Sequence, residues 1–304
     1  MKQLAFLTLN DPGDFVMDDQ HAMAPLAALG WNTSVVAWRQ TRVPWRDYSA
    51  VLIRSTWDYW DDVGGFLAVL DSIDNATRLA NPLPLVRWNL AKTYLRELEN
   101  KGIRIVPTLW PERLDAASLA NLCDQLASDE VVIKPVVGAN GVDAFRLARD
   151  LGREPWAQIT ARVRQRRFMV QAFMPAILNE GEYSLMFFNG EFSHAILKVP
   201  ARGEFRSQEE RGAAIHPVIP ETALLHAARR ALATIATPLY ARIDMVRDPN
   251  NDFAVMEFEL IEPSLYLRTD PDAPLRFARA VDEWFRQPGT AGHRAGPTPA
   301  GVLP

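Results

Sequence analysis

The sequence predicts an α/β unit at the N-terminus followed by mixed α+β units. Apolar runs typical of strands alternate with helical segments in the first third of the chain, whereas later strands follow one another closely. The dipeptide Asn189-Gly190 is typical of the two-residue turn of a β-hairpin. Because 304 residues exceed the usual size of one compact core, we expect two or three packed subdomains.

The N-terminal unit, residues 1–87, is expected to contain a small parallel sheet. Residues 4–9 form a continuous apolar run, as in a strand that is covered on both faces. Gly30 is expected to end the helix that precedes the second strand. The remaining elements are expected in the order helix 18–29, strand 33–38, strand 50–54 and helix 62–73. This βαβαβ order favours a parallel sheet with helices on both faces.

Two α+β units are expected to follow. The first, residues 88–167, begins with a helix that Asn89 caps and Gly102 ends. Its strands are expected at 103–106, 131–134 and 144–147. The second unit covers residues 168–287, and its expected elements are strands 168–173, 182–188, 191–198, 240–247 and 253–260 with helices 220–236 and 271–285.

The tail, residues 288–304, lacks a hydrophobic period and is expected to be flexible.

The composition excludes several classes of partner. A formal net charge of -4 gives no basic field for nucleic acid. The single cysteine, Cys123, excludes an internal disulfide framework and suits a reducing compartment. No run approaches the roughly 20 apolar residues of a membrane span. We therefore expect a cytoplasmic protein with no nucleic-acid or membrane partner, and leave a homo-oligomer open.

Two lysines stand where a purely structural explanation is weak. Lys92 occupies the third position of an expected helix, whose N-terminus already carries positive partial charge. Lys134 ends the apolar run 131–133, and a glycine-bounded turn follows, made of Gly138, Ala139, Asn140 and Gly141. Glycines let backbone amides approach a phosphate closely. Each lysine alone also fits a solvated side chain, and the turn alone fits a hairpin.

Three carboxylates are expected to converge near the C-terminal strands. Glu257 and Glu259 alternate with apolar residues, so both lie on one face of their strand. Asp244 lies on the preceding strand, and Arg242 shares its face. Hard oxygen ligands from adjacent strands are what Mg²⁺ requires between carboxylates and phosphates. An ordinary polar sheet face is the weaker explanation, because like charges on one face repel.

Taken in order, these features resemble the ATP-grasp superfamily. The similarity covers residues 88–267 and rests on an ordered set of motifs: Lys92, Ile133-Lys134-Pro135, the turn at 138–141, Gln171-Ala172-Phe173-Met174, Glu182, Ala241-Arg242-Ile243-Asp244 and Glu257-Phe258-Glu259. The runs at 88–92 and 259–264 look most like the small glutathione-synthetase-like group, which includes D-cycloserine cyclo-ligase.

The resemblance implies a fold and a set of roles. Two α+β subdomains would clamp ATP, with the N-terminal α/β unit beside them. Lys92 and Lys134 would contact the phosphates, and Gly138 to Gly141 would form a mobile flap. The other implied roles are adenine binding by Gln171, Ala172 and Phe173, ribose binding by Glu182, coordination of one or two Mg²⁺ by Asp244, Glu257 and Glu259, and stabilisation of the transferred phosphate by Arg242.

Two positions depart from the family pattern. Glu259 stands where many members have asparagine, which leaves the metal count and the assignment among Glu257, Glu259 and Glu262 open. Gln171 replaces the usual acidic residue at the start of the hinge, and its amide can still hydrogen-bond adenine.

The resemblance implies an ATP-dependent carboxylate-amine ligase or cyclo-ligase. A carboxylate would attack the γ-phosphate to give an acyl phosphate, an amine would displace phosphate, and ADP and phosphate would be released. Such phosphoryl transfer depends on positioning and charge neutralisation. The alternatives are a small-molecule kinase on the same fold and a non-catalytic nucleotide-binding module.

An amino-acid-like substrate is expected at the carboxyl ends of the N-terminal strands. Arg54 can grip a carboxylate and Asp58 can bind an ammonium group, although the two could equally pair with each other. A polar loop, residues 200–212, could close over triphosphate and substrate, and Lys198 beside it is a candidate catalytic cation with Arg242. The full set of candidate substrate residues is Arg54, Ser55, Trp57, Asp58, Tyr59, Arg202, Arg211, Glu262 and Ser264.

Overall fold

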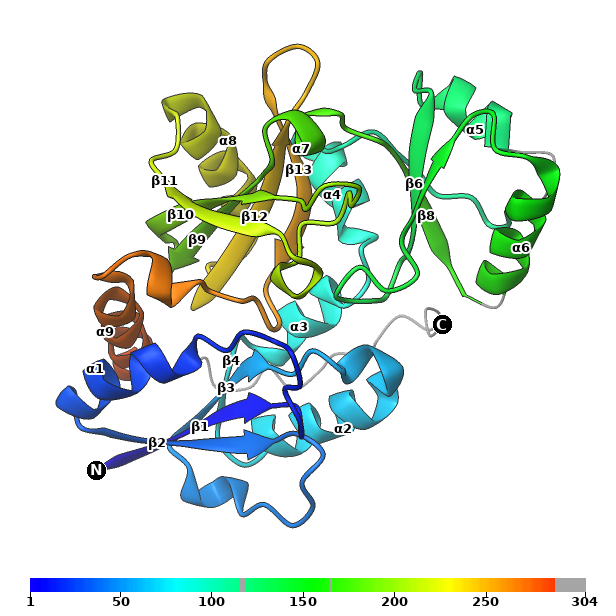
Figure 1. Cartoon of the computed structure of the whole chain (residues 1–304). Helices are drawn as coiled ribbons and strands as arrows, with labels where there is room; N and C mark the ends of the chain where they lie inside the picture. Colours follow the sequence, from blue (N-terminus) through cyan, green and yellow to red (C-terminus); the bar gives the residue numbers. More distant parts are fainter. Residues whose placement is uncertain (115–118, 165, 288–304) are drawn as a thin grey trace.

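The N-terminal unit is a four-stranded parallel sheet, as expected. The computed structural model describes residues 1–114, 119–164 and 166–287, so the predicted flexible tail lies outside it. The sheet has the order β2-β1-β3-β4, and its strands are β1 (Lys2–Thr8), β2 (Trp31–Ala37), β3 (Ala50–Ser55) and β4 (Arg78–Ala80). Helices α1 (Met23–Ala28) and α2 (Val63–Asp74) cover it (Figure 1).

Alternate residues of β1 face the two sides of this sheet. Leu4 and Phe6 belong to a core shared with α1, whereas Ala5 and Leu7 pack in the core that contains α2. The side that Leu4 faces is also covered by α9 (Ala273–Arg286), which lies beside α1 in Figure 1. The prediction of helices on both faces is therefore confirmed.

The second sheet is antiparallel and carries the flap. Its strands have the order β5-β8-β6-β7 and are β5 (Thr108–Leu109), β6 (Glu130–Pro135), β7 (Phe145–Ala148) and β8 (Phe168–Ala172). Helices α5 (Leu119–Gln125) and α6 (Arg153–Val163) share its core. Because β8 pairs with β6, a boundary drawn from sheet membership follows residue 172 rather than residue 167.

The third sheet is antiparallel and has five strands. Its order is β11-β10-β9-β12-β13, with β9 (Glu182–Phe188), β10 (Glu191–Val199), β11 (Ala214–Val218), β12 (Tyr240–Arg247) and β13 (Phe253–Glu259). Leu185 and Phe187 of β9 pack with α4 (Tyr94–Asn100) and α8 (Thr222–Leu232). Met186 and Phe188 face the opposite side, toward α9 and the N-terminal unit.

Buried polar groups join the N-terminal unit to the third sheet. The Tyr240 hydroxyl lies 2.6 Å from the Ile53 carbonyl and 3.1 Å from the Ala80 carbonyl. The Asn81 amide donates to the carbonyls of Tyr240 and Leu260 at 2.9 and 2.7 Å. Satisfied buried polar groups specify one packing arrangement, because an unpaired partner would be costly. These contacts therefore fix the N-terminal unit against β12 and β13.

Three local predictions were wrong. The helix expected from Asn89 to Gly102 is two helices, α3 (Leu83–Asn89) and α4, so Asn89 ends a helix instead of capping one. Its buried amide donates to the Phe258 carbonyl and accepts from the Leu260 N–H, tertiary bonds that sequence does not reveal. Residues 103–106 form one isolated bridge, between Ile105 and Val255, in place of a strand. The helix expected at 18–29 is a short 3-10 turn (Asp19–Ala22) followed by α1.

The remaining short elements connect these layers. They are α7 (Ala176–Asn179) and 3-10 turns at Trp45–Asp47, Tyr59–Asp61, Glu209–Arg211 and Leu267–Thr269. No helix in the described part of the chain is long and apolar enough to cross a bilayer.

Candidate active site

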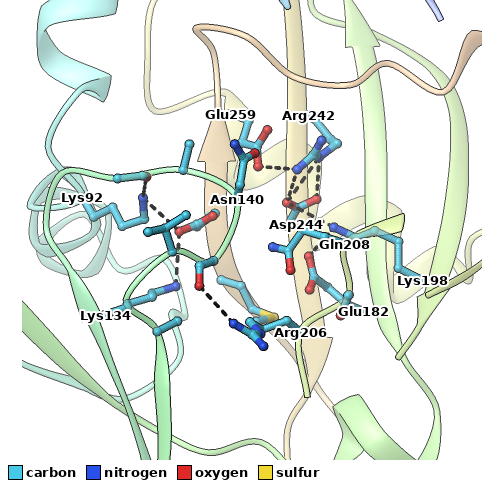
Figure 2. Close-up of a pocket in the computed structure, with 18 of the residues that line it drawn as sticks. Lys92, Lys134, Asn140, Glu182, Lys198, Arg206, Gln208, Arg242, Asp244 and Glu259 are labelled. Atoms are coloured by element: carbon cyan, nitrogen blue, oxygen red, sulfur yellow. Dashed lines mark hydrogen bonds and ion pairs between the residues drawn. The ribbon is translucent and has the colours of Figure 1, made fainter. Parts of the chain in front are cut away.

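A single deep pocket collects residues from all three units. Residues of the flap sheet, of β12 and β13 and of the N-terminal unit all line it. Most of the predicted site residues line it: Trp57, Tyr59, Lys92, Lys134, Gly138, Ala139, Asn140, Gly141, Gln171, Ala172, Phe173, Glu182, Lys198, Arg242, Asp244, Glu257, Glu259, Glu262 and Ser264. Figure 2 shows how the charged members of this set face one another across the pocket.

Lys92 and Lys134 meet at one carboxylate. Their ammonium groups lie 3.3 and 3.2 Å from the same oxygen of Glu257 (Figure 2). Lys92 also donates to the Gly138 carbonyl at 2.7 Å and therefore contacts the flap. Burial opposes ionisation of Glu257, but the two lysines hold the pKa of its carboxyl at about 2. Two fixed positive charges thus face the pocket from different elements.

Lys92 does not occupy a helix N-terminus, contrary to the sequence prediction. It lies between α3 and α4, where its backbone N–H donates to the Val136 carbonyl at 2.9 Å. The bond ties this connection to the end of β6 and so places Lys92 near Lys134. The position was anticipated, but for the wrong physical reason.

The flap turn is held over the pocket by contacts with two other segments. Asn140 and Gly141 have φ values of +56° and +61°, a conformation that asparagine and glycine tolerate best. The Asn140 side chain donates to the Trp57 carbonyl at 3.0 Å, which links the flap to the N-terminal unit. Arg211 donates to the Asn140 carbonyl at 3.3 Å from the loop over residues 200–212. Arg211 therefore contacts the flap from outside the pocket lining.

The hinge residues lie at the end of β8. Gln171 is buried, and its amide donates to the Thr108 hydroxyl at 3.0 Å. The backbone N–H groups of Ala172 and Phe173 donate to the carbonyls of Pro107 and Glu130. Sheet bonds thus hold this strand rigid where it reaches the pocket wall.

Strand register brings the three predicted metal ligands together. Asp244 on β12 lies opposite Glu257 on β13, and Arg242 lies opposite Glu259. Carboxylate oxygens of Asp244, Glu257 and Glu259 all lie within 4.8 Å of one another. Since Mg²⁺ binds oxygen at about 2.0–2.1 Å, ligands on opposite sides of one ion stand about 4.2 Å apart. The hard oxygen donors therefore suit Mg²⁺, which would draw the three oxygens slightly closer together.

Two buried cations neutralise this cluster. Arg242 reaches Asp244 with Nε and Nη2, both at 2.9 Å, and also pairs with Glu259. Lys198 lies 2.5 Å from Glu182 and 3.5 Å from Asp244. Burial opposes ionisation of Asp244, but Arg242 and Lys198 lower the pKa of its carboxyl below the ordinary value. Burial instead raises the pKa of Glu259, in opposition to Arg242.

Five predicted substrate residues lie outside the pocket lining, and each of these expectations is corrected: Arg54, Ser55, Asp58, Arg202 and Arg211, the last of which contacts the flap. Arg54 is 2% exposed, and it pairs with Asp19 at 2.9 Å and donates to the Pro263 carbonyl at 3.0 Å. Ser55 is buried beside the same aspartate. Asp58 pairs with Arg39 at 3.2 Å, not with Arg54, and Arg202 is exposed. Saturated or remote side chains cannot grip a ligand in the pocket.

Several pocket residues were not predicted: Phe15, Val16, Tyr94, Gln208 and Tyr266. One signal was present for Phe15 and Val16. Their loop follows β1, whose carboxyl end lies at the same edge as that of β3. For the others, no local pattern distinguishes a pocket residue from a core residue.

Arg54 is expected to be essential for stability and to have no direct contact with substrate. Arg54→Met leaves Asp19 buried and unpaired, so we expect the free energy of unfolding to fall by roughly 3 kcal/mol. Urea denaturation measures this change, and Arg46→Met, at an exposed position, is the matched control. A variant of native stability with a weakened affinity for the acyl substrate would restore the substrate role.

Comparisons with known proteins agree with this geometry. The family model of the D-cycloserine synthetase DcsG N-terminal domain matches residues 4–81, and that of the prokaryotic glutathione synthetase ATP-grasp domain matches residues 84–240. The cycloserine biosynthesis protein DcsG of Streptomyces lavendulae is 33% identical over 273 residues, which cover 84% of this chain and 89% of the relative.

Solved structures give the same result. The crystal structure of D-cycloserine synthetase DcsG has a TM-score of 0.80 at 30% identity, covering 93% of this chain and 100% of the other. D-alanine–D-alanine ligase from Bacillus anthracis, complexed with ATP, has a TM-score of 0.64 at 14% identity and covers 94% and 97%, which shows the fold alone. The chain therefore belongs to the ATP-grasp family of Mg-ATP-dependent ligases, in the group that combines a DcsG-type N-terminal domain with a glutathione-synthetase-type ATP-grasp domain.

Proposed function

We propose that this ATP-dependent ligase activates the carboxylate of an amino-acid-like small molecule and converts it into a C–N bond, within one molecule or between two. The observation that carries the proposal is one pocket with two lysines under a flap, three carboxylates opposite them, and an N-terminal wall beyond both. A nucleotide and a small acid can meet there.

The pocket residues suggest where ATP lies. Lys92, Lys134 and the flap turn at 138–141 would hold the phosphates, while the end of β8 would border the adenine. Glu182 would bind the ribose after exchanging its contact with Lys198. Asp244, Glu257 and Glu259 would hold one or two Mg²⁺, which neutralise phosphate charge.

The reaction divides into two displacements. A carboxylate oxygen of the substrate attacks the γ-phosphorus, the bond to the β,γ-bridging oxygen breaks, and ADP leaves. The amine nitrogen then attacks the acyl carbon, the C–O bond to phosphate breaks, phosphate leaves, and the amine gives up a proton. Arg242 lies beside the carboxylate cluster, where it can neutralise the transferred phosphoryl group. The flap, joined to Trp57 through Asn140, excludes water that would hydrolyse the acyl phosphate.

Product analysis tests the proposal. Purified protein is incubated with Mg-ATP and a panel of amino acids, and products are identified by mass spectrometry with D-cycloserine as a reference compound. We expect ADP, phosphate and an organic product that has lost one water. Loss of water from one molecule identifies a cyclo-ligase, and loss of water between two identifies an intermolecular ligase.

Other outcomes select the alternatives. A stable phosphorylated acid without a new C–N bond would identify a kinase, and AMP with pyrophosphate would contradict the mechanism. Nucleotide binding without any turnover would identify a binding module, although binding alone does not need three converging carboxylates. We also propose a cytoplasmic location, which cell fractionation tests. Light scattering tests whether the protein forms a homo-oligomer.

A further inference from the structure

Almost every charge in the pocket has a partner on the protein. Lys92 and Lys134 both form ion pairs with Glu257, and Arg242 forms ion pairs with Asp244 and Glu259. The other pairs are Lys198 with Glu182, Arg206 with Glu204, and Arg268 with Glu209. In the empty pocket these pairs therefore leave no unpaired cation among the described lining residues.

Glu262 differs from these paired groups. It lines the pocket at 9% exposure, yet no cation of the described chain lies within ion-pair distance of its carboxylate. Lys92 and Arg242 are the nearest positive influences on it, and both are already paired elsewhere. Burial, with Glu259 adding to the effect, raises the pKa of the Glu262 carboxyl to about 8. Without a cation beside it the neutral acid is favoured, and a cation on the ligand would stabilise the carboxylate.

The backbone around Glu262 is held in place by the N-terminal unit. Trp57 donates from its indole to the Glu262 carbonyl at 2.9 Å, and Arg54 donates to the next carbonyl, Pro263, at 3.0 Å. The turn that carries Glu262 therefore has two anchors on the substrate side of the pocket. A rigid backbone makes the carboxylate a fixed recognition group instead of a mobile one.

Aromatic side chains line the same pocket. The rings of Phe15 and Trp57 stand 4.9 Å apart, and Tyr59 lines the pocket beside them. Burial raises the pKa of the Tyr59 hydroxyl, and the nearby charge of Glu262 raises that pKa further. A buried carboxylate in a pocket that aromatic side chains also line is suited to recognising an ammonium group.

We propose that Glu262 binds the ammonium group of the acyl substrate, so that the enzyme activates acids with one carboxylate and a free amine. The inference rests on the proposed ligase function and specifies its substrate class. Acids whose amine is acylated or replaced by hydroxyl lose this contact. Acids with a second carboxylate bring a negative charge that no unpaired cation of the described lining residues meets.

A substrate-by-enzyme cycle tests the assignment. ADP release is measured with amino acids and with the matching 2-hydroxy acids, for the native protein and for Glu262→Gln. We expect the native enzyme to prefer the amine by about 10²-fold in kcat/KM, and Glu262→Gln to reduce that preference to below about tenfold. The KM for ATP should stay within threefold, and Glu262→Asp should recover part of the preference.

The outcomes separate the inference from the function beneath it. Equal use of amino and hydroxy acids by the native enzyme, or an unchanged preference in Glu262→Gln, overturns the ammonium assignment while leaving the ligase intact. Absence of ADP release with every acid overturns the ligase itself. Glu191→Gln, at an exposed site at the start of β10, controls for the loss of one negative charge. ATP-induced thermal stabilisation of Glu262→Gln shows that the variant is folded.

Discussion

Replacing Asp244 with asparagine is expected to lower kcat by at least about 10³-fold, with a smaller effect on the KM for ATP. Asp244 lines the pocket from β12, the strand next to the edge strand β13, and has contacts with Arg242 and Lys198. The substitution replaces one of three converging carboxylates by a neutral amide and leaves both cations without the negative charge that they share. Charge stabilisation of the transferred phosphoryl group is lost at the point where the reaction depends on it.

The measurement is ADP release at saturating Mg-ATP, repeated across a magnesium titration. Asp252→Asn makes the same chemical change at an exposed position in the turn between β12 and β13 and is expected to retain native rates. The unfolding midpoint of each protein, measured without ligand, shows whether the loss of the Asp244 charge beside Arg242 and Lys198 destabilises the fold. A folded Asp244→Asn enzyme with native kcat and native magnesium dependence would contradict the proposed metal cluster.

The parts of this site that the sequence predicts are those governed by strand periodicity. Glu257 and Glu259 alternate with apolar residues, and a period of two places them on one face whatever the rest of the fold does. Pairing of β12 with β13 then follows from chain order, and it brings Asp244 opposite Glu257. The parallel N-terminal sheet is predictable for a similar reason, since buried strands alternate with helices.

The parts that escape prediction depend on contacts between units. Asn89 looks like a helix cap, but its amide is satisfied by β13, more than 160 residues away. Arg54 looks like a ligand for substrate carboxylate at a strand end, but Asp19 and the Pro263 carbonyl saturate it. Local sequence gives no account of which partner is nearest in space. Glu262 is a candidate substrate residue from the sequence, but only the structure shows that no cation of the described residues pairs with it.

Replacing Lys134 with methionine is expected to remove most of the thermal stabilisation that ATP confers. Loss of a charged contact to phosphate should raise the dissociation constant for ATP by about 10²-fold. At an ATP concentration of 100 times the native constant, the ligand stabilises native protein by about 2.7 kcal/mol, and the variant by only about 0.4 kcal/mol. Differential scanning fluorimetry with and without Mg-ATP measures the difference. Lys101→Met, exposed at the end of α4, should respond to ATP as the native protein does.

The geometry also predicts how the two lysines combine. Because Lys92 and Lys134 lie against the same oxygen of Glu257, each can partly replace the other in neutralising that carboxylate. Lys92→Met alone should therefore weaken ATP binding. The loss of ATP-binding free energy in the double variant should differ from the sum of the losses in the two single variants. If the losses of binding free energy were strictly additive, the two lysines would act on ATP independently of each other. Unchanged stabilisation by ATP in Lys134→Met would remove the phosphate assignment altogether.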